Sequence, residues 1–275
     1  MAMTATAQPQ PNAVLDTILR AVGWIGLASI AVAVSLSDFL ASVPADTANA
    51  GPLLAPPSEM FRLGTDILGR DMLSETLHGL SATVRAALPA MLVALIAGAL
   101  FGFVAARLPR VLAFSLRGVI GILSAVPSLL LAILMIGLTS RGWSGLAAGL
   151  AAAPLAFVRA FERAEAQERT SHSEYARAAG ISAMTLLRRD LVYEFTQTIL
   201  SGAARSLAAV TIILSTVSFL GFAAEPPHRD LGLMIAAAKG YFLDAWWTAA
   251  FPALALTLLI LFARLAAGLG EGERA

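Results

Sequence analysis

Long stretches without a charged residue alternate with short charged segments along most of the chain. Six of these stretches are long enough to cross the roughly 30 Å hydrocarbon layer of a membrane as helices, which takes about 17–25 residues. They are Ala21–Ser37, Ala86–Ala106, Gly118–Ser140, Gly142–Val158, Ser206–Ala224 and Ala245–Ala263. Strands of a membrane barrel are shorter and alternate in polarity, unlike these stretches. The pattern therefore predicts an all-α membrane protein with six transmembrane helices.

The composition narrows the class of protein further. Of the 275 residues, 58% are hydrophobic and only 13% are charged, whereas about a quarter of an average soluble domain is charged. These values exclude a cytosolic enzyme, a disordered chain and a coiled coil. The net charge of +1 gives no reason to expect nucleic acid as a partner. Because the sequence contains no cysteine, disulfides and thiolate metal sites are excluded as well.

The arginines predict the orientation in the membrane, because basic residues gather on the cytoplasmic side of membrane helices. With the N-terminus inside, 13 of the 19 basic residues fall on the cytoplasmic side. The six that remain outside are Arg62, Arg70, Arg85, Arg141, Arg229 and Lys239. The reverse topology would invert this ratio, so we expect both termini in the cytoplasm.

The first apolar stretch has a second interpretation as a cleaved signal peptide. Ala48-Asn49-Ala50 resembles the small-residue site at which such peptides are cut. However, this site lies far beyond the end of the stretch, and no basic residue precedes Arg20. We therefore expect an uncleaved membrane anchor.

These expectations divide the chain into consecutive parts. They are a cytoplasmic N-terminus (1–20), a first anchor (21–37), a periplasmic segment (38–85), a transmembrane core (86–270) with a cytoplasmic loop (159–205), and a short tail (271–275). The periplasmic segment begins with several prolines, and its second half, Asp71–Thr83, has the character of an interfacial helix.

Within the cytoplasmic loop, residues 171–180 predict one short helix with a signal at each end. Ser171 and Glu174 have the spacing of a capping box, and Gly180 stands where a left-handed residue would end the helix. A helix of about eight residues is not stable alone in water, so it must dock against another surface. Physical reasoning leaves open whether that surface belongs to the membrane helices or to a partner. A second helix is expected from Ala183 toward the fifth apolar stretch.

Three motifs resemble one protein family. Glu174-Tyr175-Ala176 with Gly180 resembles the coupling loop of permease subunits of binding-protein-dependent ABC importers. Leu63–Asp71 resembles the outer motif of the dipeptide/oligopeptide/nickel branch, through Gly64, Thr65, Asp66, Gly69, Arg70 and Asp71. Ser218–Gly221, followed by Pro226-Pro227 and Leu231–Met234, fits the same branch. Two positions depart from the family pattern: Tyr175, where alanine is usual, and Tyr193, where a proline is usual.

The resemblance implies a type I ABC importer permease fold in the bacterial inner membrane, working with several partners. These are a second permease, two ATPase subunits and a periplasmic substrate-binding protein. It further implies that the helix docking on the ATPase comprises Glu174, Tyr175, Ala176, Arg177, Ala178, Ala179 and Gly180. The cargo implied is a di- or oligopeptide, with nickel or a metal–chelator complex as the alternative.

The residues themselves agree that this chain is not the catalytic subunit. The sequence contains no Gly-x-x-x-x-Gly-Lys-Ser/Thr phosphate-binding loop, and its one lysine, Lys239, precedes a glycine in an outer segment. We therefore expect no cofactor in this chain, with ATP and Mg²⁺ bound by the partner ATPases. An ion-coupled secondary transporter is the alternative of another class. Such carriers usually place an ionisable residue at membrane depth, and none of the six stretches contains one.

Several further residues have types and spacings that bear on metal binding or on helix packing. Glu168 with His172, and Glu225 with His228 and Asp230, are better explained as solvated loop residues than as metal sites. The small-residue pairs Gly98/Gly102 and Gly145/Gly149 have the spacing of close helix contacts. Four prolines fall within apolar stretches, where each removes a helical hydrogen bond: Pro89, Pro127, Pro154 and Pro252.

Overall fold

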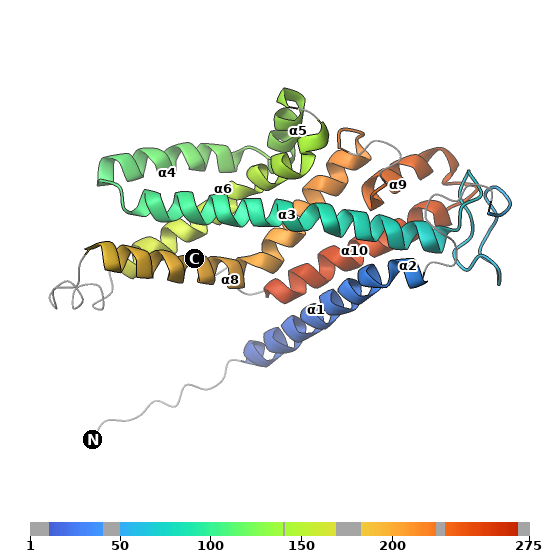
Figure 1. Ribbon diagram of the computed structural model, residues 1–275, viewed down its shortest axis with the longest axis horizontal. Coiled ribbons are helices and arrows are strands. Elements are labelled where there is room, and N and C mark those ends of the chain that lie inside the picture. The colour runs from blue at the N-terminus through green and yellow to red at the C-terminus, as the bar shows by residue number, and fades with distance from the viewer. Residues whose placement is uncertain (1–10, 41–49, 140, 169–182, 224–228, 269–275) are drawn as a thin grey trace, which may run out of the picture.

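The computed structural model describes residues 11–40, 50–139, 141–168, 183–223 and 229–268, and most of them form a bundle of long helices (Figure 1). The elements are α1 (Pro11–Ser35), α2 (Ser37–Leu40), α3 (Met72–Ala106), α4 (Arg110–Ala125), α5 (Ser128–Leu138), the 3₁₀ turn η1 (Arg141–Trp143), α6 (Ser144–Glu168), α8 (Ala183–Phe219), α9 (Leu231–Ala237), the 3₁₀ turn η2 (Ala238–Tyr241) and α10 (Trp247–Ala267). The all-α prediction is confirmed for these residues.

Five helices in the described part of the chain are long and apolar enough to cross a membrane. They include Val14–Ser35, Met72–Ala106, Ser144–Glu165, Ile199–Phe219 and Trp247–Ala267. A sixth crossing requires α4 and α5 to be counted together. The charge-free stretches therefore locate the apolar helices, while the number of crossings depends on that pair.

The third stretch, Gly118–Ser140, was expected to form one helix and instead contains a sharp break. Helices α4 and α5 meet at an angle of 94°. Pro127 explains the break, because proline has no N–H to donate and disfavours helical geometry in the residue before it. Val126 accordingly has an extended backbone, with φ −76° and ψ 129°.

Two helices extend well beyond their apolar stretches. Helix α3 has 35 residues, and the helix expected over Asp71–Thr83 is its first part rather than a separate element. Helix α8 has 37 residues and begins at Ala183, as predicted. At 1.5 Å per residue these helices measure about 50–55 Å, so each is longer than the roughly 30 Å hydrocarbon layer is thick.

Small residues bring α3 and α6 into close contact. A methyl group added at Gly98 would overlap Ala156 on α6, and one at Gly102 would overlap the Phe157 carbonyl. From the other side, Gly149 of α6 lies against the carbonyl of Ala90. The predicted role of the glycine pairs is confirmed at these three positions, which allow backbone to pack against backbone.

The bundle has two distinct ends (Figure 1). The beginnings of α3 and α10, the end of α1 and helix α9 gather at one end, together with the non-helical segment 50–71. The end of α6 and the beginning of α8 lie at the opposite end. Because α8 runs between the two ends as one unbroken helix, it connects the surroundings of segment 159–205 to the end that holds the outer motif.

Candidate functional site

The outer motif forms a tight turn against the beginning of α10. Gly64 and Gly69 both have positive φ, at +79° and +68°. A side chain at Gly64 would lie 2.7 Å from both the Ala55 carbonyl oxygen and Trp247 Nε1. Glycine is therefore required at position 64 for two reasons: only glycine adopts this backbone conformation without strain, and only glycine fits the space.

Thr65 joins this turn to a transmembrane helix. It is completely buried, its hydroxyl donates to the Pro52 carbonyl, and the same oxygen accepts from the Ala55 N–H at 2.8 Å. Its carbonyl accepts from the indole Nε1–H of Trp247, the first residue of α10, at 3.1 Å. Thr65 thus fixes the segment 50–71 both internally and to the bundle.

The two aspartates of the motif each order the backbone near them. Asp66 Oδ1 accepts from the N–H groups of Leu68 at 2.7 Å and Arg70 at 2.8 Å. Asp71 is the N-cap of α3, where its Oδ2 accepts from the N–H and hydroxyl of Ser74. Each carboxylate therefore satisfies donors that would otherwise lack a partner at a turn or helix start.

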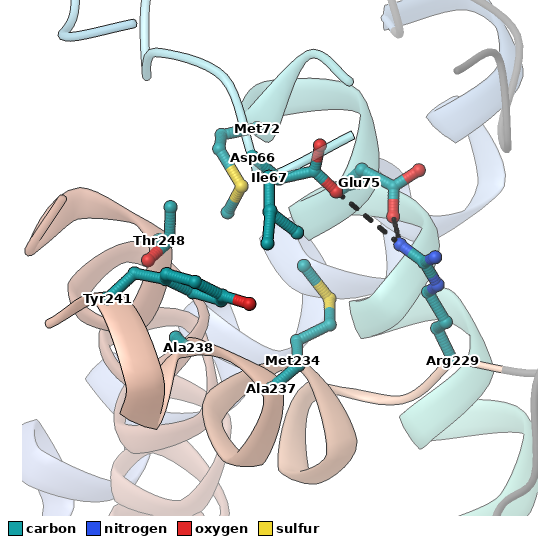
Figure 2. Close-up of a pocket in the computed structure, with 10 residues that line it drawn as sticks. All are labelled: Asp66, Ile67, Met72, Glu75, Arg229, Met234, Ala237, Ala238, Tyr241 and Thr248. Carbon is teal, nitrogen blue, oxygen red and sulfur yellow. Dashed lines mark hydrogen bonds and ion pairs between the residues drawn. The ribbon is translucent and has the colours of Figure 1, made fainter. Parts of the chain in front are cut away.

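A charged cluster connects this motif to the segment before α9. Arg229 Nη1 lies 2.7 Å from Glu75 Oε2 and 3.7 Å from Asp66 Oδ2 (Figure 2). Glu75 Oε2 also lies 3.8 Å from Arg70 Nη1. The Glu75 side chain is only 7% exposed. We call Asp66, Arg70, Glu75 and Arg229 the outer clasp. Its two carboxylates and two guanidinium groups balance in charge, as a poorly solvated cluster requires.

The clasp borders a small cavity of about 60 Å³. Figure 2 shows Met72 and Met234 on its apolar side, with Tyr241 opposite the clasp. Pockets for small-molecule ligands usually measure about 300–1,000 Å³, so this cavity has room for a few water molecules only. It is too small to serve as a passage for a peptide.

Helix α9 is fixed to both long helices that flank it. Asp230 caps α9 by accepting from the Leu233 N–H at 2.9 Å, and it also accepts from the Ser218 hydroxyl near the end of α8. The Leu231 N–H donates to Thr83 Oγ1 of α3 at 3.0 Å. The third family motif consists of Ser218–Gly221 and Leu231–Met234, and these two separated halves therefore meet at the end of α8.

The sequence predicted the motif residues but missed two members of the clasp. Glu75 lies in the first turn of α3, and Arg229 lies 154 residues later along the chain. No local pattern pairs residues so far apart. Within the described ranges no group of three potential ligands could hold a metal ion, and Asp230 serves as a helix cap. The hydrogen bonds and ion pairs of this site all join chain segments, so its chemistry is structural.

The predicted coupling helix cannot be compared in the same way. Glu174, Tyr175, Ala176, Arg177, Ala178, Ala179 and Gly180 lie outside the described residues. The neighbouring helices end at Glu168 and begin at Ala183. Tyr193, where the family usually has proline, lies within α8, and the helix continues through it unbroken.

Comparison with known proteins matches most of this structure to one family. Residues 94–270 match the family described as binding-protein-dependent transport system inner membrane component. The di/tripeptide transport system permease protein DppC of Pseudomonas aeruginosa is 30% identical over 230 residues, which cover 81% of this chain and 75% of that protein. The peptide transport system permease protein SapC of Escherichia coli is 29% identical, over 92% of this chain and 87% of that protein.

A third relative extends the same match over nearly the whole chain. The dipeptide transport system permease protein DppC of Haemophilus influenzae is 25% identical, over 92% of this chain and 88% of that protein. The family match covers α6, α8, α9, α10 and the loop 159–205, and the alignments over 92% of the chain reach beyond it. The chain belongs to the family of binding-protein-dependent transport system inner membrane components.

Proposed function

We propose that this protein is one of two permeases of an ATP-driven importer of di- or oligopeptides. The observation that carries the proposal is the alignment with the di/tripeptide permease of P. aeruginosa, at 30% identity over 81% of this chain. The other two relatives reported above are likewise named for peptide transport. These names favour peptides over nickel or a metal–chelator complex, and the family favours ATP-driven import over an ion-coupled carrier.

Family membership defines the general role of the chain. It is a multi-pass protein of the bacterial inner membrane and a non-catalytic component of its transport system. Energy must therefore come from partner subunits. We infer that two ATPases bind ATP and Mg²⁺, that a second permease completes the path, and that a periplasmic binding protein delivers the cargo.

We further infer six crossings with both termini in the cytoplasm, counting α4 and α5 as one. If that pair entered and left the membrane on the cytoplasmic side, α6 would cross outward and place segment 159–205 in the periplasm. This segment contains seven arginines. Such a concentration of positive charge favours the cytoplasmic side.

The mechanism proposed for this permease begins at the coupling loop. Residues Glu174–Gly180 dock on an ATPase, so that ATP-driven closure of the ATPase pair moves the end of α6 and the start of α8. Helix α8 is continuous for 37 residues and ends beside Asp230, which holds α9. A shift at the cytoplasmic end is thereby transmitted to the outer clasp, and access to the path alternates between the two sides.

A deletion strain tests the proposed cargo. Cells lacking this gene should lose uptake of a radiolabelled dipeptide such as Ala-Phe, and the wild-type gene should restore it. Uptake of radioactive nickel should be the same in all three strains. Loss of nickel uptake with normal dipeptide uptake would contradict the proposal in favour of the metal alternative.

A further inference from the structure

A second and larger hollow adjoins the α9–η2 segment. Its volume is about 450 Å³, within the range of ligand pockets. The apolar residues that line it come from α8, α9, the turn after η2 and α10: Phe219, Ile235, Phe242, Ala249, Ala250 and Ala253. The three alanines leave open a space that larger side chains on α10 would fill.

Lys239 is the one charged residue in this lining, and it is also the only lysine of the protein. Its Nζ lies 3.7 Å from the centroid of the Phe219 ring. This cation–π contact holds the ammonium group at the hollow while leaving N–H donors for another partner. Within the described part of the chain, no carboxylate forms an ion pair with Lys239.

The contacts described above hold the segment that carries Lys239. The α9–η2 segment contributes Met234 and Ala238 to the small cavity beside the clasp, and Ile235 and Lys239 to the hollow. Asp230 caps this segment and accepts from Ser218, the neighbour of Phe219. These hydrogen bonds join the end of α8, which carries Phe219, to the start of the α9–η2 segment, which carries Lys239.

We propose that this hollow binds the C-terminal end of the peptide cargo during its passage, with Lys239 binding the carboxylate. This inference rests on the proposed function. Every free di- or oligopeptide carries one carboxylate at its end, and a single ammonium group in apolar walls complements such a group. Charge-assisted hydrogen bonds hold the carboxylate, while Phe219 and Phe242 contact the adjacent side chain.

Uptake by the complete complex tests the role of the charge. The permease pair, the ATPases and the loaded binding protein are reconstituted in proteoliposomes, and uptake of radiolabelled Ala-Phe is measured below saturation. Lys239→Gln should lower uptake about tenfold or more, whereas Lys239→Arg should stay within about twofold of wild type. Arg62→Gln removes an exposed outer charge that does not line the hollow, so it should match wild type.

Cross-linking tests whether the cargo is the occupant. The photoreactive residue p-benzoylphenylalanine replaces Phe242, which lines the hollow. The same replacement at the neighbouring Leu243, which is 95% exposed, is the control. Labelled Ala-Phe should cross-link from position 242 during turnover, only weakly from 243, and less after Lys239→Gln.

The outcomes separate this proposal from the proposed function. If the wild-type complex takes up no Ala-Phe, peptide import itself fails. If it does, wild-type uptake by Lys239→Gln overturns the role of Lys239. Cross-links to lipid or to the second permease in place of the peptide would assign the hollow to that occupant. Such a result also overturns the proposal, even if uptake is reduced.

Discussion

At the scale of single residues, Arg229 joins three parts of the outer end through one guanidinium group. Its Nη1 lies within 2.7 Å of Glu75 on α3 and 3.7 Å of Asp66 in the outer motif. The next residue, Asp230, caps α9. Removing one member of a poorly solvated ion pair is costly, because the opposite charge is left without compensation.

We therefore expect Glu75→Gln to destabilise the protein by about 2–3 kcal/mol and to lower its Tm by about 5–10 °C. The effect should fall when Arg229→Gln is added, because the double variant no longer contains the uncompensated arginine. The measurement is thermal unfolding of the purified protein in lipid nanodiscs. Glu59→Gln, an exposed change on the same outer segment, is the control and should leave Tm within about 1 °C of wild type. Equal Tm values for Glu75→Gln and Glu59→Gln would show that the clasp does not stabilise this end.

Residue patterns predicted the part of this site that depends on residues close in sequence, but not the part that depends on residues far apart in sequence. Asp71 and Ser74 lie close in sequence, so the start of a helix could be inferred from their order. Glu75 and Arg229 come together only after α3 and α9 have packed, and neither residue type is unusual where it stands. The segment around Gly64 was identified by its resemblance to the family's outer motif, while the contact of Gly64 with Trp247 required the folded bundle.

At the scale of elements, the contact between α3 and α6 depends on glycines, which have no side chain to separate the two helix backbones. Gly102→Val would place two methyl groups against the Phe157 carbonyl and Ala160. Because the obstacle includes helix backbone, relief requires the helices to separate. We expect a loss of about 2–3 kcal/mol and a much lower yield of folded protein, measured by size-exclusion chromatography and thermal unfolding.

Gly121→Val is the matched control for this change. Gly121 lies within α4, and among the described residues no group outside its own helix backbone lies within 4 Å of a Cβ added there. The same substitution there should change the free energy of unfolding by less than about 1 kcal/mol. If both variants behave alike, helix propensity rather than close packing explains the loss.

The bend between α4 and α5 decides the number of crossings and can be tested by a topology reporter. Alkaline phosphatase, which is active only outside the cytoplasm, is fused after Trp143. If the pair crosses the membrane once, this fusion should be active, whereas a fusion after Gly268 should be inactive. Activity of the second fusion without the first would show that the pair returns to the cytoplasmic side.

The apolar stretches predicted the helices well, because length and absence of charge are sufficient to identify a membrane helix. They could not predict the 94° angle, since Pro127 is compatible with anything from a slight kink to a complete break. They also could not predict that α3 begins at Met72. Glu75, His78 and Arg85 interrupt the charge-free run without interrupting the helix, because they lie in its part near the outer end.

At the scale of the whole molecule, two functional ends are linked by one continuous helix. The outer end contains the clasp, the carboxylate-binding hollow that we propose, and the segment that ties them to α10. The other end leads into the loop whose sequence resembles a coupling signature. Helix α8 begins near that loop and ends at Phe219 in the wall of the hollow. In our proposal, ATP-driven movement and cargo contact therefore involve the same element.

ATP hydrolysis coupled to peptide uptake is the measurement that tests the central claim most directly. The complete complex is reconstituted with loaded binding protein, and both rates are followed for wild type, Gly180→Pro and Glu174→Ala/Arg177→Ala. We predict that wild type takes up Ala-Phe only with ATP. Uptake by both variants should be at least about tenfold lower than uptake by wild type, because the complex fails to assemble or because ATP hydrolysis is no longer coupled to uptake. Uptake without ATP, or variants that assemble and transport like wild type, would contradict the account.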